Sequence, residues 1–295
     1  MPLLHPSDLE TLAIITEQAA AKAGKYISEC SQREIKVMHK AGGDSLASQV
    51  VTEVDGQAQS IVLETLEPTF PKYDLALLTE ESEDDGSRLE KDYFWCIDPL
   101  DGTLPFTQGK PGYGVSIALI QKDGTPVIGV VYDPTEKTLY RAVRGQGIQM
   151  NGSPWNIPKY DPEKKQVLNI CFDCSFETDP NREKISTQMQ EIAQKSGYTS
   201  AHIHIGGGAV LNACYVLQNP PAIYFKPPKP NPGGGSFWDF AATACLFHEA
   251  GAHATDFHGE SLALNKPGNT FMNEHGVFFC TSARLHSESL NAYGH

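Results

Sequence analysis

Two carboxylates stand three residues apart in the segment that follows the apolar run Tyr93 to Ile97. The run predicts a strand, and a strand end is a rigid place to hold charged groups. Asp98 and Asp101 are close enough to repel each other unless a cation lies between them, and hard divalent cations prefer such oxygen ligands. The backbone carbonyl of Leu100 could supply one more oxygen. The spacing therefore indicates a metal site at the end of this strand.

The two residues that follow could extend a metal site into a phosphate site. If a helix begins there, the N–H groups of Gly102 and Thr103 point at an anion bound beside the metal. The simpler alternative is a turn that caps a helix, because Asp, Pro and Gly are common turn formers. Acidic residues elsewhere favour the first interpretation. A second apolar run ends in Glu80-Glu81, and Asp239 stands in the first turn of a predicted helix.

Three motifs together resemble those of the inositol monophosphatase family, which includes inositol phosphate phosphatases and 3'(2'),5'-bisphosphate nucleotidases. They are Asp98-Pro99-Leu100-Asp101-Gly102-Thr103 with Phe106, the pair Glu80-Glu81, and Trp238-Asp239-x-Ala-Ala. Their order and spacing match the family's pattern, and the resemblance covers nearly the whole chain.

The resemblance implies two or three Mg²⁺ ions bound by carboxylates. One ion would be held by Glu80, Asp98 and the Leu100 carbonyl. A second would be held by Asp98, Asp101 and Asp239, so that Asp98 bridges the two. The ligands are all oxygens, which favours magnesium over softer metals. Inhibition by lithium is a further implication of the resemblance.

The resemblance also implies how the attacking water is activated. Thr103, polarised by Asp55, would orient or deprotonate the water, with Glu80 as a further catalytic group. Asp55 stands in a Thr-x-x-Asp helix start, where its ordinary role would be to face the helix dipole. The amides of Gly102 and Thr103 would bind phosphate oxygens. Because adjacent strand residues point to opposite faces, we expect Glu81 to lie behind Glu80 rather than on the metal.

The choice of substrate is expected to depend on the loop before Trp238. In the family's inositol-specific enzymes an acidic residue stands a few positions before this Trp. Here the stretch Phe225 to Phe237 contains no carboxylate and carries Lys226 and Lys229 instead. These lysines would meet a second phosphate, which favours a 3'(2'),5'-bisphosphate nucleotide over an inositol monophosphate. An ordinary irregular loop is the alternative. A separate loop around Lys40, with a Gly-Gly pair after it, stands where the family has a mobile loop at the metal site.

The composition sets broad limits on partners and location. The chain has 295 residues, of which 40% are hydrophobic, and a formal net charge of −13. The negative charge disfavours a nucleic-acid polymer as partner, and a small anionic substrate would need local metal ions or lysines. A small phosphorylated metabolite is the partner that the resemblance implies. We expect no membrane association, because no apolar run reaches membrane length. Seven scattered cysteines predict reduced thiols and hence a cytoplasmic protein. A homodimer is implied only by the resemblance.

The predicted elements place the motifs on a layered α+β and α/β sandwich. In residues 1–157 helices pack on one side of a mainly antiparallel sheet that carries Glu80 and the Asp98–Thr103 motif. In residues 158–295 strands and helices alternate and carry Trp238-Asp239, with the active site between the two halves. Ser7 predicts the start of the first helix through a capping box. The acidic segment 82–90 is expected to be a solvated loop.

The function that these patterns favour is Mg²⁺-dependent hydrolysis of a small phosphate monoester. Two metal ions can neutralise the phosphate, orient a water and stabilise the departing alkoxide. The alternative is a catalytically silent metal-binding or scaffold protein of the same fold. Thr103 and Asp55 argue for the enzyme, because a protein that only binds metal needs no pair that activates water.

Overall fold

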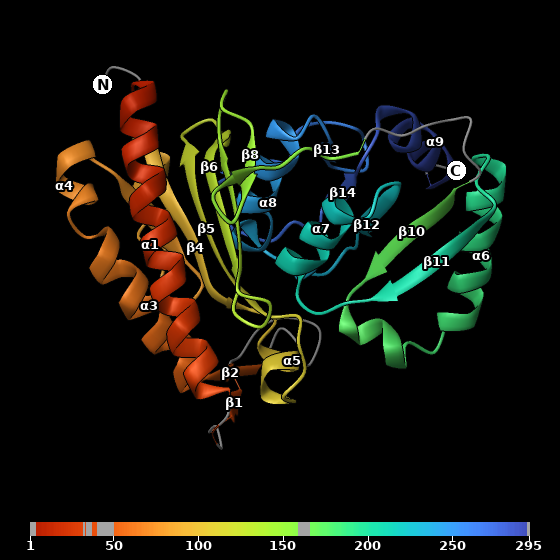
Figure 1. The fold of residues 1–295 in the computed structure, drawn as a ribbon, viewed down its shortest axis with the longest axis horizontal. Helices are drawn as coiled ribbons and strands as arrows, with labels where there is room; N and C mark the ends of the chain where they lie inside the picture. Colours follow the sequence, from red (N-terminus) through yellow and green to blue (C-terminus); the bar gives the residue numbers. More distant parts are fainter. Residues whose placement is uncertain (1–3, 32, 34–36, 40–49, 159–165, 294–295) are drawn as a thin grey trace.

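The computed structural model describes residues 4–31, 33, 37–39, 50–158 and 166–293. The predicted loop around Lys40 lies outside the described residues. Across the molecule the elements form successive layers of helices, sheet, helices, sheet and helix (Figure 1). The layered α and β architecture expected from the sequence is therefore confirmed.

A seven-stranded sheet with the order β3-β4-β5-β6-β7-β8-β9 forms the first β layer. Its strands are β3 (Ala76–Thr79), β4 (Tyr93–Asp101), β5 (Gly114–Gln121), β6 (Pro126–Asp133), β7 (Thr138–Val143), β8 (Ile148–Met150) and β9 (Ser153–Pro154). All neighbouring strands pair antiparallel except β3 and β4, which are parallel. The consecutive strands from β4 onward therefore form the mainly antiparallel sheet that the sequence predicts.

The helices α1 (Pro6–Cys30) and α3 (Glu53–Leu66) cover one face of this sheet, with the short α4 (Thr69–Tyr73) beside them (Figure 1). Alternate residues of β4 and β5 are buried against them, including Trp95 and Ile117. The predicted capping box at Ser7 is wrong. His5 is the N-cap and Asp8 closes the box, because Pro6 has a fixed φ and no N–H and therefore suits the first helical position.

The opposite face of the sheet is covered by α8 (Phe237–Glu249), which comes from the second half of the chain. We expected helices on one side only, and this holds for α1 and α3 but not for the whole sheet. Gly129 of β6 permits the close approach, since a Cβ there would lie 2.3 Å from the carbonyl oxygen of Ala242. Burial on both faces makes the strand β4 a rigid support for the residues at its end.

A second sheet of five strands has the order β11-β10-β12-β14-β13. Its strands are β10 (Val167–Phe172), β11 (Ser200–Ile205), β12 (Ala222–Lys226), β13 (His253–Thr255) and β14 (Val277–Cys280). The remaining elements are β1 (Val37–His39), β2 (Val50–Thr52), η1 (Ser87–Leu89), α5 (Thr103–Thr107), η2 (Cys174–Thr178), α6 (Arg182–Lys195), α7 (Ala209–Gln218) and α9 (Ala283–Tyr293). The predicted alternation of strand and helix is present, whereas a division into two domains at residue 157 stays a prediction.

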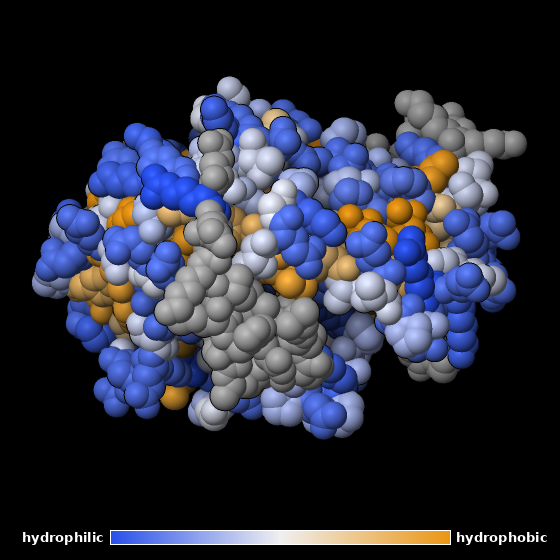
Figure 2. Space-filling view, turned by 90° about the horizontal axis from the view of Figure 1, so that it is seen from below, coloured by the Kyte–Doolittle hydropathy of each residue, from blue (hydrophilic) through white to orange (hydrophobic). Residues whose placement is uncertain are grey.

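The surface seen from below the view of Figure 1 is largely hydrophilic, with smaller apolar areas between (Figure 2). Among the described helices, none combines the length and the apolar character that a membrane crossing requires. All seven cysteines of the chain are free thiols.

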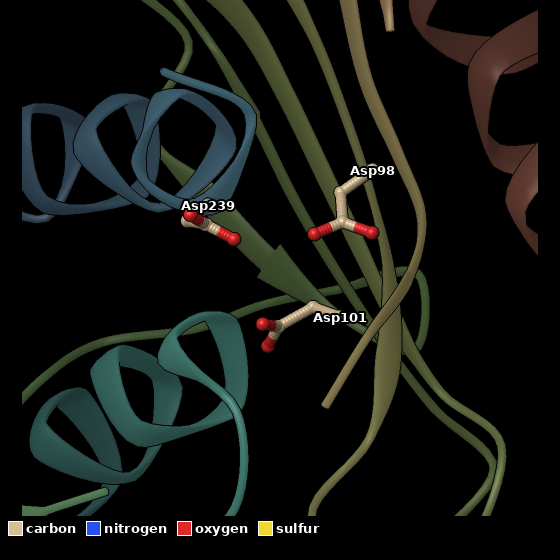
Figure 3. Close-up of side chains that lie close together, drawn as sticks. All are labelled: Asp98, Asp101 and Asp239. Carbon is tan, nitrogen blue, oxygen red and sulfur yellow. The ribbon is translucent and has the colours of Figure 1, made fainter. Parts of the chain in front are cut away.

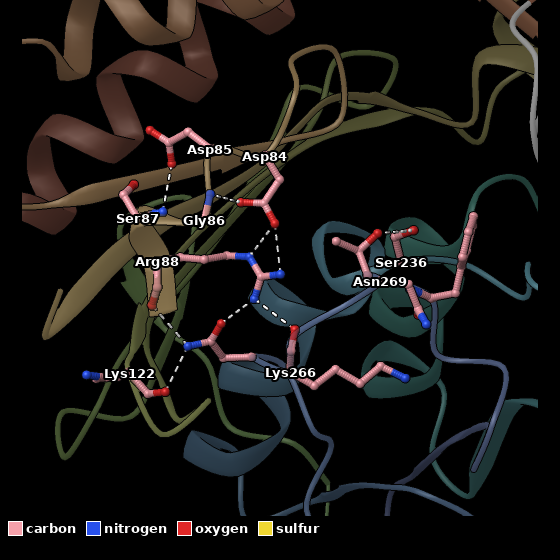
Figure 4. Close-up of polar contacts among 12 residues, drawn as sticks. Asp84, Asp85, Gly86, Ser87, Arg88, Lys122, Ser236, Lys266 and Asn269 are labelled. Carbon is pink, nitrogen blue, oxygen red and sulfur yellow. Dashed lines mark hydrogen bonds and ion pairs between the residues drawn. The ribbon is translucent and has the colours of Figure 1, made fainter. Parts of the chain in front are cut away.

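The acidic segment 82–90 is exposed at residues 82–85 and at Glu90, as expected for a solvated loop, but it is not solvated throughout. It contains η1, and the side chain of Arg88 is only 2% exposed. The guanidinium donates to Asp84 (2.8 Å), to the Asn265 side chain (2.5 Å) and to the Lys266 carbonyl (3.1 Å), as Figure 4 shows. These partners make burial of the charge possible. Asn265 is 177 positions away, so local charge could not reveal the contact.

Candidate active site

Three carboxylates from two distant segments meet at the end of β4. Asp98, Asp101 and Asp239 each present a carboxylate oxygen within 4.8 Å of the others (Figure 3). Residues three apart on a regular strand would point to opposite faces. The pairing of β4 with β5 shifts between Asp98 and Asp101, however, and this bulge turns both toward the face that α8 covers. The expected convergence of these three residues is thus present in the fold.

Asp101 is held by the start of helix α7. Its two oxygens accept hydrogen bonds from the amides of Ala209 (3.2 Å) and Val210 (2.8 Å). The free N–H groups of a first helical turn favour a negative charge, so this position stabilises the carboxylate. Gly208 is needed for the approach, since a Cβ there would lie 2.3 Å from Asp101 Oδ2. We did not anticipate this support; the run Gly206-Gly207-Gly208 before the helix was the available signal.

Asp239 is fixed in the first turn of α8. The amide of Ser236 donates to Asp239 Oδ2 at 2.5 Å, and the two residues form a capping box. Burial raises the pKa of Asp239, although the nearby Lys226 ammonium and the Ser236 amide lower it. One oxygen of the Asp239 carboxylate can therefore cap the helix while the other binds a metal ion.

Asp98 carries the least satisfied atom of the group. Its Oδ1 accepts a hydrogen bond from the Leu100 amide at 3.0 Å, while its Oδ2 is buried and has no hydrogen-bond partner among the described residues. Burial raises the pKa of Asp98 well above its usual range, and the carboxylates of Glu80, Asp101 and Asp239 raise it further. A divalent cation would satisfy this oxygen and neutralise the neighbouring charges, so the residues present fit a metal.

The adjacent acids Glu80 and Glu81 lie near different carboxylates. The Glu80 amide donates to the Ile97 carbonyl at 3.1 Å, which continues the β3–β4 pairing, and its carboxyl lies beside Asp98. The Glu81 carboxylate lies near Asp55, whose pKa it raises. The role of Glu80 as a ligand and the placement of Glu81 behind it stay predictions.

Thr103 and Asp55 are joined by a hydrogen bond, as the family resemblance implied. Thr103 Oγ1 donates to Asp55 Oδ1 at 3.0 Å and also lies 3.1 Å from the Leu100 carbonyl oxygen. Asp55 Oδ2 accepts from the amide and the hydroxyl of Thr52 at 2.8 and 2.6 Å. Burial raises the pKa of Asp55, whereas the hydrogen bonds from Thr52 and Thr103 lower it. The pair is buried next to the carboxylate cluster and keeps a fixed orientation.

A helix does begin after the Asp98–Asp101 pair, as expected. Gly102 is the N-cap of α5, with φ of +80°, and Thr103 is its first residue. A side chain at Gly102 would collide with the Gly112 carbonyl oxygen at 2.5 Å. The binding of phosphate by the amides of Gly102 and Thr103 stays a prediction.

The two lysines of the loop lie in different surroundings. Lys226, at the end of β12, forms an ion pair with Asp173 at 3.0 Å, and its ammonium lies 5.7 Å from the centre of the Phe240 ring. Lys229 is anchored through its backbone to Asn273 and lies beside Gly234. Lys226 lies near the carboxylate cluster, since the carboxylates of Asp239 and Asp101 act to raise its pKa.

Gln59 braces the strand end that carries Glu80, a contact that the sequence did not suggest. Its side-chain oxygen accepts from the Thr79 hydroxyl (2.5 Å) and the Glu81 amide (3.3 Å), and its Nε2 donates to Ser82 (2.8 Å). Gln59 stands one turn after Asp55 on α3, so the helix presents both residues on one side. An alternation of polar and apolar residues along the helix could not show which polar residue faces inward.

Comparison with known proteins agrees with this geometry. The sequence model of the inositol monophosphatase family matches residues 8–293. The Nus factor SuhB of Vibrio cholerae is 31% identical over 83% of this chain and 85% of its own length. Among solved structures, SuhB of Bartonella henselae has a TM-score of 0.72 at 24% identity and covers 96% of this chain and 98% of its own. The inositol monophosphatase of Anabaena has a TM-score of 0.70 at 24% identity, covering 97% and 96%.

Proposed function

Because the chain belongs to the inositol monophosphatase family, we propose that it is a Mg²⁺-dependent phosphoric monoester hydrolase acting on a small metabolite in the cytoplasm. The observation that supports this most is the buried, unpartnered Oδ2 of Asp98 among carboxylates of other segments, next to the hydrogen-bonded pair Thr103–Asp55. A structural protein has no use for this combination of uncompensated acids and an oriented hydroxyl.

The metal would be bound by residues that the fold already brings together. Asp98, Asp101 and Asp239 lie close enough together to hold one ion. Glu80, Asp98 and the Leu100 carbonyl would hold another, and the Glu80 carboxylate is near enough to raise the pKa of Asp98. Bound Mg²⁺ would neutralise the phosphate and lower the pKa of a coordinated water.

The chain's own groups position the remaining reactants. Thr103 Oγ1 donates its proton toward Asp55 Oδ1, so the hydroxyl can take the proton of the attacking water while its own proton passes to Asp55. The water oxygen forms a bond to phosphorus, the ester P–O bond breaks, and the departing alkoxide takes a proton from a second water molecule. The amides of Gly102 and Thr103, at the start of α5, would donate to phosphate oxygens.

The proposed substrate is an inositol monophosphate or a 3'(2'),5'-bisphosphate nucleotide. Lys226 favours the nucleotide slightly, because its ammonium lies near Asp239 and Asp101 and would meet a second phosphate. Lys229 would contribute from the neighbouring loop.

A panel of phosphate esters tests the proposal. Phosphate release would be measured with inositol monophosphates, phosphoadenosine phosphate, fructose bisphosphate and histidinol phosphate, in Mg²⁺ and in EDTA. We expect release from at least one ester in Mg²⁺, its loss in EDTA and its absence in Asp98→Asn, which controls for a contaminating phosphatase. Release from no ester in Mg²⁺ would reject the proposed activity.

A scaffold function is the second candidate, since relatives about 31% identical are named Nus factors. Such a protein would act through partners, with a metal site that supports the fold. The Thr103–Asp55 pair favours the enzyme. Mg²⁺ binding without hydrolysis of any ester would favour the scaffold instead.

A further inference from the structure

Asp173 lies between β10 and η2 and is held by three donors from the second half of the chain. Its Oδ1 accepts from the Tyr224 hydroxyl at 2.8 Å and from the Asn212 side-chain amide at 2.9 Å. Its Oδ2 forms the ion pair with Lys226 at 3.0 Å. Because Oδ1 is fixed by two rigid elements, the carboxylate cannot turn away when Lys226 meets another partner.

The start of α7 connects this residue to the metal-site candidate. The amides of Ala209 and Val210 hold Asp101, and Asn212, in the same turn of the helix, holds Asp173. Asn212 is itself fixed, since its Oδ1 accepts from the Gly207 amide at 3.0 Å. Asp173 and Lys226 therefore lie close enough to Asp101 for their charges to act on it.

Lys226 is a permanent cation in this position. Burial opposes its charge, but the carboxylates of Asp173 and Asp239 outweigh burial and raise its pKa. Its side chain is 22% exposed, so a bound molecule can reach it. Its charge is nevertheless balanced by Asp173, and the pair as a whole is neutral.

We propose that Asp173 is a specificity-determining residue that limits the use of substrates with a second phosphate by neutralising Lys226. A second phosphate that approaches Lys226 must meet the fixed negative charge of Asp173 a few ångströms away. A substrate that carries only hydroxyl groups there meets no such repulsion and can donate to Asp173 or accept from Lys226. This inference rests on the proposed phosphatase function and on Lys226 as the group that meets the second phosphate.

The test compares two substrates across matched variants. The ratio of kcat/KM for phosphoadenosine phosphate to that for inositol 1-phosphate would be measured in Mg²⁺. In Asp173→Asn the ratio should rise about tenfold, because removing a charge a few ångströms from a phosphate changes its binding at least that much. Tyr224→Phe removes one hydrogen bond to Asp173 but leaves its charge, so its ratio should stay at the wild-type value. Adding Lys226→Met to Asp173→Asn should abolish the gain.

The outcomes separate this inference from the function on which it rests. If wild type hydrolyses either ester but Asp173→Asn changes both kcat/KM values equally, Asp173 is only structural and the inference is wrong. An equal rise in Tyr224→Phe would also contradict it, because the charge would then not be the cause. Asp173→Ser serves as a second variant if the Asn variant does not fold. Hydrolysis of neither ester by wild type would instead reject the proposed activity on these substrates.

Discussion

At the scale of single residues, the site depends on acids that the fold keeps close although they repel each other. Asp98 is the centre of this arrangement, because Glu80, Asp101 and Asp239 all act on it. The sequence revealed these acids through their positions at the ends of apolar runs. It could not reveal that a bulge turns Asp98 and Asp101 to one face, since a bulge depends on the pairing with β5.

Replacing Asp98 by Asn should abolish hydrolysis and weaken Mg²⁺ binding while the protein stays folded. The amide has the same shape but lacks the charge that would bridge two ions. Calorimetry of Mg²⁺ binding, phosphate release and melting in EDTA would measure the three effects. Activity near that of wild type would remove Asp98 from the bridging role.

The raised carboxyl pKa values predict how the stability of the metal-free protein depends on pH. A raised pKa means that the folded state holds protons at pH values where the unfolded chain has released them. The stability from these groups is therefore complete below the unfolded pKa, near 4, and is lost as pH rises through the folded pKa values of Asp98, Asp101 and Asp239.

Melting temperatures in EDTA across mildly acidic to neutral pH should fall, and Mg²⁺ should restore more stability at the higher pH. Asp98→Asn removes one of these groups and should show a shallower fall. A melting temperature in EDTA that rises over the same interval would contradict the assignment of these raised pKa values.

At the scale of elements, helices deliver the groups that hold the site in place. Helix α3 presents Asp55 to Thr103 and Gln59 to the strand end that carries Glu80. The start of α7 holds Asp101. The existence of both helices could be predicted from periodicity and turn residues. Their contacts could not, because each joins segments that are far apart in the chain.

Gln59→Leu should weaken Mg²⁺ binding and lower stability by about 1–3 kcal/mol, the cost of leaving buried polar groups unpaired. The Thr79 hydroxyl and the Glu81 amide would lose their acceptor, and the strand end that carries Glu80 would loosen. Gln57 is exposed on the same helix, so Gln57→Leu is the matched control. Equal losses of Mg²⁺ affinity in the two variants would rule out this role for Gln59.

Gly208→Ala should displace the Asp101 carboxylate and weaken Mg²⁺ binding, at a cost of about 1–3 kcal/mol in stability. The added methyl would lie 2.3 Å from Asp101 Oδ2. Gly56→Ala is the control, and its expected effect on stability has the opposite sign. Gly56 lies within α3 with no atom within 4 Å of an added Cβ, so Ala should stabilise by about 0.5–1 kcal/mol. Chemical denaturation and calorimetry would measure both effects.

At the scale of the whole molecule, the site lies where the two sheets are packed through α7 and α8. The layered architecture could be predicted, because strands in series and then in alternation with helices leave few arrangements. The contacts that join the two halves of the chain could not be predicted, and Arg88 is the clearest example. It joins the segment after Glu80–Glu81 to Asn265, and its guanidinium lies 5.5 Å from the ring of Phe237, two residues before Asp239.

Arg88→Met should therefore weaken Mg²⁺ binding and also lower the stability of the protein. We expect a loss of stability of about 3 kcal/mol, the low end of the range for a broken buried ion pair, because Asp84 is partly exposed to solvent. Arg141 supplies the matched control. It is also buried, but it pairs with Glu10 and Glu17 of α1, on the other face of the first sheet.

Arg141→Met should lower the melting temperature by a similar amount and leave Mg²⁺ affinity unchanged at a temperature where both variants are folded. The contrast separates the two roles of a buried arginine, because only Arg88 connects the segment that carries Glu80 with the helix that carries Asp239. If both variants bind Mg²⁺ as wild type does, the geometry of the carboxylates is set by the strands and α7 alone, and Arg88 serves only the fold.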